Sequence, residues 1–367
     1  MDEMKSESVV RVRPAERKDT EAIIGVLGRN GMGDPDPATW REMWDGYPFA
    51  DEFRDIPTGW VLETESGTVV GNLNNVHLLY EMSGRRLRGT VAAGWAVDSP
   101  YRGKSLRLMT TFFKQPGIDI YLNVSASPAT AQVLTGMKIP RIPIPDYGIP
   151  CLWATRPRAF ARAALSRRST PGAAALAWPA GLLLRVYDTV RRSGRSHLST
   201  SIRRFDRFDD RVDALWQQIN AGPTRLRAVR TKAVLEWRFR TELRERRIAI
   251  AATERGGTLL GYAVLIRRAG SELEMEMYDI ADIQAAGDDP AIIRDLLLGS
   301  LQIAREDGMD ALKFVTGMPS RRLAAEQLRP WTYHLPFWQQ YFKTAAPEVA
   351  AALSTADAWD FSVFDTF

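Results

Sequence analysis

The sequence predicts an α/β (α+β) protein built of two similar domains, each a mixed, mostly antiparallel sheet flanked by helices and joined by a helical linker. A chain of 367 residues is too long for one ordinary hydrophobic core. Its composition, 45% hydrophobic and 25% charged, is typical of a globular protein. Patterns in the first half also return about 190 residues later, which favours two copies of one domain type.

The repeat begins with a helix that contains tryptophan and arginine, followed by two strands. "TWREMW" at 39–44 precedes an alternating stretch at 59–81, and "VLEWRFR" at 234–240 precedes a similar stretch at 247–268. Each alternating stretch contains a glycine turn, so each predicts two antiparallel strands.

Both halves then continue as strand, helix, strand and helix. Alternating apolar residues predict the strands, and apolar residues three or four apart predict the helices. The expected strands lie at 89–97, 118–124, 273–280 and 311–315, and the expected helices at 104–113, 128–135, 291–307 and 320–328.

The two domains are expected at 8–150 and 201–367, with a basic linker at 151–200. Between Arg156 and Arg204 the chain has eleven arginines and a single acidic residue, Asp188. Two amphipathic helices in this segment fit a linker packed over the domains, or a surface that contacts an anionic membrane through 156–204. Nucleic acid is not expected, because the aromatic residues are not interleaved with the basic ones.

Other residue counts narrow the class of protein. The single cysteine, Cys151, excludes an internal disulfide framework. The three histidines are far apart, so no metal site is expected. The first residues are charged and lack the apolar core of a signal peptide. We expect a cytoplasmic protein, with a peripheral location at the inner membrane face if the linker contacts lipid.

The segment "AVDSPYRGKSLRLM" carries the main functional signal. A basic, glycine-containing turn joins a buried strand to the first turn of a helix. A helix N-terminus presents unpaired N–H groups and a partial positive charge, which suits phosphate. Gly103 lets the backbone approach such a group, and Arg102 and Lys104 add charge.

This segment resembles motif A of the GNAT superfamily of acyl-CoA transferases, and "SASPATAQVLTGMKI" resembles the segment that follows it in that family. The resemblance implies that acetyl-CoA or another acyl-CoA is the cofactor. It implies that Val97 binds the pantetheine from the strand edge and that backbone N–H groups of a short run bind the diphosphate: Arg102, Gly103, Lys104, Ser105 and Leu106. Ser105 and Arg107 depart from the family, which has small residues at both places.

No catalytic residue can be assigned from the resemblance. The fourth strand carries no acid, and Leu134 stands where the family often has a tyrosine. Tyr121 and His77 are substitutes, although a packing role explains the first and a surface position the second. In the second copy, alternating acids at 274–279 predict a solvent face or the border of an amine site.

The second copy has Asp288 and Asp289 where the basic glycine turn should lie. Carboxylates repel a diphosphate, so this copy is not expected to hold such a cofactor.

The expected function is acyl-CoA-dependent N-acyl transfer, as an N-acetyltransferase acting on a small-molecule amine or a cell-envelope or polysaccharide precursor. Two alternatives remain open: a Fem-type aminoacyl transferase, and a non-catalytic pair of domains that binds a ligand or partner.

Overall fold

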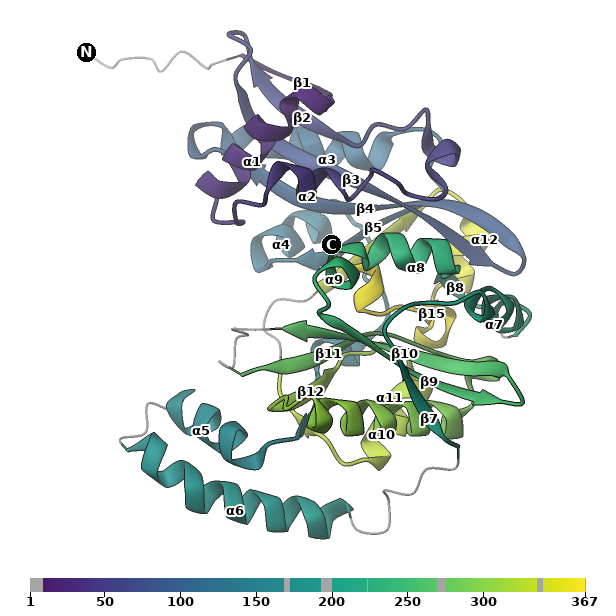
Figure 1. Cartoon of the computed structure of the whole chain (residues 1–367). Helices are drawn as coiled ribbons and strands as arrows, with labels where there is room; N and C mark the ends of the chain where they lie inside the picture. The colour runs from purple at the N-terminus through teal and green to yellow at the C-terminus, as the bar shows by residue number, and fades with distance from the viewer. Residues whose placement is uncertain are drawn as a thin grey trace. The chain divides into compact units, whose positions relative to one another are not determined.

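A computed structural model describes residues 9–167, 172–192, 200–222, 224–268, 275–334 and 339–366. The chain forms two compact units, each with its own sheet (Figure 1). The first unit contains the residues up to Ile142 together with 337–354 and 365–367. The second contains 143–336 and 355–364.

The first unit has a mixed sheet in the order β1-β2-β3-β4-β5-β14. All these strands pair antiparallel except β4 and β5, which are parallel. The strands are β1 (Val10–Pro14), β2 (Gly59–Thr64), β3 (Val69–Met82), β4 (Arg85–Val97), β5 (Ile120–Ala126) and β14 (Gln339–Thr344).

Helices cover both faces of this first sheet. Val61 packs in a cluster with residues of α1, whereas its neighbour Trp60 packs edge-on against Phe112 of α3. Adjacent residues of a strand point to opposite faces, so α1 and α3 lie on opposite sides. The helices are α1 (Thr20–Arg29), α2 (Pro37–Arg41), α3 (Ser105–Lys114), α4 (Pro128–Gly136) and α12 (Pro347–Ala352).

The second unit repeats this plan in the order β7-β9-β10-β11-β12-β6-β13, and its parallel pair is β11 with β12. The strands of its sheet are β6 (Cys151–Ala154), β7 (Ile202–Phe205), β9 (Ile248–Arg255), β10 (Thr258–Arg268), β11 (Met277–Ala285), β12 (Ala311–Phe314) and β13 (Trp331–Thr332). Two short strands outside this sheet, β8 (Leu226–Ala228) and β15 (Trp359–Asp360), pair with each other in parallel.

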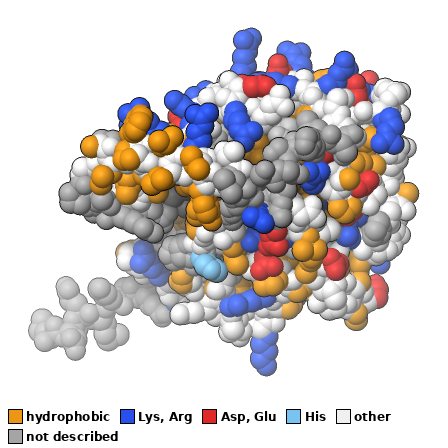
Figure 2. All heavy atoms as spheres, turned by 90° about the horizontal axis from the view of Figure 1, so that it is seen from below, with side chains coloured by type: hydrophobic (Ala, Val, Ile, Leu, Met, Phe, Trp, Pro, Cys, Tyr) orange, Lys and Arg blue, Asp and Glu red, His pale blue; other side chains and the backbone are white. Residues whose placement is uncertain are grey.

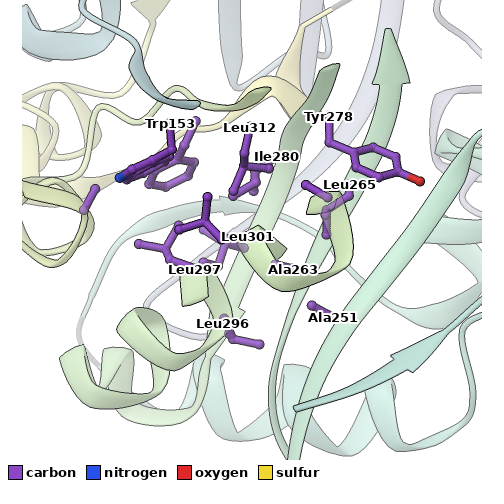
Figure 3. Packing of buried hydrophobic residues seen from close by; sticks show 14 of the residues in the cluster. Trp153, Ala251, Ala263, Leu265, Tyr278, Ile280, Leu296, Leu297, Leu301 and Leu312 are labelled. Carbon is purple, nitrogen blue, oxygen red and sulfur yellow. The ribbon is translucent and has the colours of Figure 1, made fainter. Parts of the chain in front are cut away.

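The core of the second unit lies between its sheet and α10. Leu296, Leu297 and Leu301 of that helix pack on Ala263 and Leu265 of the sheet (Figure 3). The helices of this unit are α5 (Pro157–Arg167), α6 (Ala173–Arg192), α7 (Arg211–Asn220), α8 (Lys232–Arg238), α9 (Arg240–Arg244), α10 (Pro290–Glu306) and α11 (Pro319–Gln327).

The structure divides the chain differently from the continuous ranges expected from the sequence. The residues 151–154, expected to start the linker, form β6 and pair with β12 of the second sheet. β14, expected in the second domain, pairs with β5 of the first sheet. The strand that follows each repeat in the chain therefore completes the other repeat's sheet, and hydrophobic periodicity does not encode this exchange.

Candidate functional site

The first structural mark of a site is a bulge in β4. The register between β3 and β4 shifts between Asn72 and Asn74. The side-chain amides of these two residues donate to the carbonyls of Gly94 at 2.7 Å and Ala93 at 3.2 Å. Gly94 has a φ of +57°, and a Cβ there would lie 2.8 Å from Nδ2 of Asn74. The bulge thus requires glycine on both conformational and steric grounds.

The strands β4 and β5 part just before the bulge. Their parallel pairing ends at Val91 and Leu122, although β4 continues to Val97 and β5 to Ala126. Peptide groups of β4 that face β5 beyond Val91 therefore have no strand partner there. Such an edge can bind the amides of an extended ligand in the way that it would bind another strand.

Two buried polar atoms in the parted strands also lack partners among the described residues. One is a donor, Nε1 of Trp95 on β4, and the other an acceptor, Oδ1 of Asn123 on β5. A buried polar group without a hydrogen bond costs about 1–3 kcal/mol. A ligand with amide groups, such as the pantetheine arm of CoA, could satisfy both, so these residues fit that cofactor.

The corresponding place in the second unit is filled by the chain itself. The pairing of β11 with β12 ends at Ile280, whereas β11 continues to Ala285. In the part of β11 that does not pair with β12, the Asp282 carboxylate accepts from Nε of Arg230 at 3.0 Å, and Gln284 accepts from Nη2 of Arg321 at 3.2 Å. At the place that corresponds to the parted strands, Asp282 and Gln284 are thus bound by arginines of the chain itself.

The turn after β4 is a 3-10 helix, Ser99–Lys104, that leads directly into α3. Two N–H groups of this run are engaged within the chain, because Tyr101 donates to Asp98 O and Ser105 donates to Arg102 O. This differs from the expected cradle of free amides, since a helical turn uses N–H groups internally. The Asp98 carboxylate does not cap the turn; it pairs with Arg29 at 2.8 Å.

The turn carries two cationic side chains, and there is open space at its glycine. Arg102 and Leu106 are exposed, Lys104 and Ser105 are half-buried, and nothing lies within 4 Å of a Cβ built on Gly103. The backbone of Gly103 has no positive φ, so its conformation does not require glycine. Because Gly103 has no side chain, it leaves room beside the cationic side chains of Arg102 and Lys104.

Two further residues of this region have structural roles. Val97 is buried, and its Cγ2 lies 2.9 Å from the position of a Cβ on Gly71, which explains the close approach of β3 there. Arg107 points to the edge strand and donates to Val10 O at 2.7 Å. The guanidinium of Arg107 is therefore engaged at the edge strand β1.

A cavity of about 360 Å³ lies on the α1 side of the first sheet and reaches the bulge through Asn74. This volume lies within the usual range for small-molecule sites. Trp40 and Trp44 form part of its wall in an edge-to-face arrangement, with ring centroids 5.9 Å apart. Charged lining residues include Arg41 and an ion pair between Arg17 and Asp45.

Both tryptophans are half-buried, and Trp40 also packs against the hydrophobic cluster of α1 and the sheet. Nε1 of Trp44 donates to Asn75 O at 2.9 Å, which holds its ring in place. Their spacing of four residues on a helical segment was the one sequence signal for the cavity. The position of Asn74 at its base depends on the bulge, which the sequence pattern does not reveal.

His77 and Tyr121, the two residues considered as substitutes for a catalytic base or acid, are buried in the first unit. His77 is stacked on Phe53 with ring centroids 4.8 Å apart, and its Nε2 lies 3.2 Å from Pro57 O. Burial lowers the pKa of His77 to about 4, so its imidazole is neutral and a weak base at pH 7. The Tyr121 hydroxyl donates to Gln115 O, and burial raises its pKa. Neither lines the cavity.

The acids of the second copy are engaged within the chain. Asp289 accepts from Ala291 N at 2.8 Å and caps α10, and Asp288 pairs with Arg321 at 3.6 Å. On β11 and before it, Asp279 pairs with Lys313 at 3.0 Å and Glu276 binds Arg267 at 2.9 Å. Glu274 lies outside the described residues.

The two mixed sheets, the bulged β4 and the parting of β4 from β5 define the fold as that of the GCN5-related N-acetyltransferases, the GNAT fold. Comparison of the sequence with protein-family models and with curated proteins gives no match.

Solved structures that share the fold cover most of the chain. A GCN5-related N-acetyltransferase from Anabaena variabilis ATCC 29413 has a TM-score of 0.58 at 12% identity, over 92% of this chain and 74% of its own. A GCN5-related N-acetyltransferase from Kribbella flavida has a TM-score of 0.55 at 14% identity, over 95% of this chain and 74% of its own. Saccharomyces cerevisiae N-myristoyltransferase, solved with bound myristoyl-CoA, has a TM-score of 0.54 at 12% identity, over 93% of this chain and 85% of its own.

Proposed function

We propose that this protein is an acyl-CoA-dependent N-acyltransferase whose cofactor binds in the first unit. The observation that carries the proposal is the parting of β4 and β5, together with the unpartnered Nε1 of Trp95 and Oδ1 of Asn123. The shared fold supports it, because solved proteins of this fold include N-acetyltransferases and a myristoyl-CoA complex.

The pantetheine would lie along β4 beyond Val91, with Trp95 and Asn123 binding its amides and Val97 at the strand edge. The diphosphate would lie at the turn before α3. Because amides of that turn are engaged, we assign most of the binding to the side chains of Arg102 and Lys104, with Gly103 providing room. Ser105 and Leu106 complete the proposed contact at the start of the helix.

The acceptor amine would occupy the cavity at Trp40 and Trp44, next to the bulge. In the reaction, the amine nitrogen bonds to the thioester carbon, the carbon–sulfur bond breaks, and the amine proton leaves while the thiolate gains one. The indole faces would hold the apolar side of an amine such as an amino sugar or another cell-envelope precursor, and the Arg17–Asp45 pair would bind its polar groups.

No side chain of the cavity is assigned as the base. Asp45 and Glu16 are its carboxylates, and each is paired with a cation, Arg17 and Lys18. Deprotonation through a water molecule fits this arrangement. A short acyl group such as acetyl is the simplest proposal for the donor, since Trp40 and Asn74 lie close to the bulge.

Calorimetric titration of the full chain with acetyl-CoA tests the proposal. We expect binding, and we expect Arg102→Ala combined with Lys104→Ala to weaken it about tenfold or more, since a hydrogen bond to a charged group contributes about 1.5–3 kcal/mol. The matched control, Lys18→Ala with Arg54→Ala, removes the same charge from other surface sites of the first unit and should bind normally.

Absence of binding at high protein concentration would contradict the proposal and favour the Fem-type or non-catalytic alternative. Binding that the Arg102/Lys104 pair leaves unchanged would place the diphosphate elsewhere.

A further inference from the structure

The helix α6 exposes an unusual number of large apolar side chains. Trp178 is 60% exposed and Leu183 is 71% exposed. The whole set is Leu176, Trp178, Leu182, Leu183, Val186 and Tyr187, which we call the α6 patch. Figure 2, seen from the side where α5 and α6 lie in Figure 1, shows hydrophobic side chains gathered at one end with basic ones beside them.

The α6 patch is not the packing face of its helix. Ala177, Gly181 and Asp188 are buried and form the inner face. A Cβ on Gly181 would lie 2.6 Å from the Cα of Arg158, so α5 and α6 are in close contact there. At 100° per residue, these three positions cluster on one side, and Leu176, Leu183 and Val186 fall on the other.

The inner face is thus packed within the second unit, whereas Leu176, Leu183 and Val186 on the outer face are exposed. Tyr187 alone of the α6 patch contacts another ring, that of Trp331, among the interactions described. The α6 patch runs from Leu176 to Tyr187, about 17 Å along the helix axis at 1.5 Å per residue, so it is a strip and not an isolated spot.

The charge around the α6 patch has one sign. Residues 156–192 contain eight arginines and one acid, Asp188. That acid is buried on the inner face, whereas Arg158, Arg162 and Arg185 are exposed. The solvent-facing charge near the patch, within the described residues, is therefore positive.

A strip of tryptophan, leucine and valine beside exposed arginines is the pattern of a helix that lies in a membrane interface. The apolar face enters the headgroup region, and the arginines interact with anionic lipid. Across the described part of the chain, none of the helices combines the length and the hydropathy of a transmembrane span. The pattern fits a helix that lies on a bilayer.

We propose that the outer face of α6 binds the surface of an anionic phospholipid bilayer and holds the protein there as a peripheral membrane protein. The uniformly positive charge around the apolar strip favours anionic lipid over a protein partner, because a protein partner does not require charge of one sign. The inference is independent of the acyl-transfer proposal, because it uses no residue of the first unit.

Co-sedimentation of the full chain with vesicles tests this proposal. We expect binding to vesicles of phosphatidylcholine with 30% phosphatidylserine, weak binding to phosphatidylcholine alone, and a decrease at 1 M salt. Removing one surface arginine should lower partitioning about fivefold, since each contributes about 1 kcal/mol near an anionic surface. We therefore expect the double variant Arg162→Gln with Arg185→Gln to partition to these vesicles about 25-fold less than the wild-type protein.

Two matched variants separate the apolar contribution from a general effect of charge. Leu183→Glu should abolish binding, whereas Leu323→Glu should retain it, because Leu323 is 61% exposed on α11 and lies outside the patch. Arg255→Gln, at an exposed position of β9, is the control for the arginine pair. Circular dichroism and the thermal midpoint verify that each variant is folded.

Three results would overturn the proposal. The first is that wild-type protein does not bind vesicles containing phosphatidylserine. The second is equal binding by Leu183→Glu and Leu323→Glu. The third is a dimer in analytical ultracentrifugation that Leu183→Glu converts to a monomer, which would assign the α6 patch to a second copy of the chain.

Discussion

At the scale of single residues, the two units differ in the polar side chains beside the place where the parallel strands part. Nε1 of Trp95 and Oδ1 of Asn123 lack partners among the described residues, whereas Asp282 and Gln284 are bound by arginines. Proteins satisfy most buried polar groups, so two such atoms beside the parted strands of the first unit favour a ligand there.

We expect Trp95→Phe to act in opposite directions on stability and on binding. The change removes a buried donor that costs free energy without ligand, so thermal stability of the free protein should rise or stay the same. If Nε1 binds the pantetheine, affinity for acetyl-CoA should fall by about fivefold or more, as expected for one lost hydrogen bond of about 1 kcal/mol. Thermal unfolding and calorimetric titration measure the two effects.

Trp216→Phe serves as the control, since Trp216 is a buried tryptophan of α7 in the other unit. An equal loss of acetyl-CoA affinity in both variants would remove Trp95 from the site.

Residue roles were the part that the sequence predicted least well. His77 was expected at the surface but is buried beside Phe53, because β3 carries a polar network on a covered face of the sheet. Arg107 was expected at the turn but reaches Val10. Which way a long side chain points depends on tertiary neighbours, and the local pattern does not contain them.

At the scale of elements, the bulge at Gly94 connects the fold to the site. It requires a positive φ and the Asn72 and Asn74 amides, and it lies in the part of β4 after Val91 that no longer pairs with β5. The cavity wall and the parted strands therefore depend on one irregularity in one strand.

Gly94→Ala should destabilise the protein by about 1–3 kcal/mol, because alanine strains the left-handed conformation and its Cβ approaches Asn74. We also expect weaker acetyl-CoA binding, because the bulge positions the parted strands. Urea unfolding and calorimetry measure these changes.

The comparison variant is Gly136→Ala, whose Cβ would meet nothing within 4 Å and whose φ is not positive. A Gly94→Ala protein as stable as this control would show that the bulge does not depend on glycine.

Most regular elements were predicted well from periodicity. The helices expected at 104–113 and 291–307 correspond to α3 and α10 within a few residues. The strand expected at 273–280 corresponds to β11, which continues to Ala285 because its far end is buried on both faces and does not alternate. Short strands such as β1 and β7 gave too little pattern to be predicted.

At the scale of the whole molecule, each sheet is completed by the strand that follows the other repeat in the chain. β14 pairs antiparallel with β5, and Tyr341 and Phe342 of β14 are buried. β6 does the same for β12. Pairing between strands so distant in sequence has no local signal, which is why the expected continuous domains differ from the two units.

We expect residues 9–142 alone to aggregate or to unfold without cooperativity, because β5 would have an unpaired edge. The same fragment fused through a flexible linker to 339–354 should be monomeric and unfold cooperatively, since it regains β14 and α12. Size-exclusion chromatography and urea unfolding distinguish the two outcomes. Similar behaviour of both fragments would mean that β14 contributes little.

The position of β14 also has a consequence for synthesis of the protein. The ribosome makes β5 long before it makes Gln339–Thr344, and at about 5–20 residues per second the interval is roughly 10–40 s. During that time a nascent chain presents an open strand edge to its surroundings. The yield of folded protein in a cell should therefore depend on chaperones that bind nascent chains.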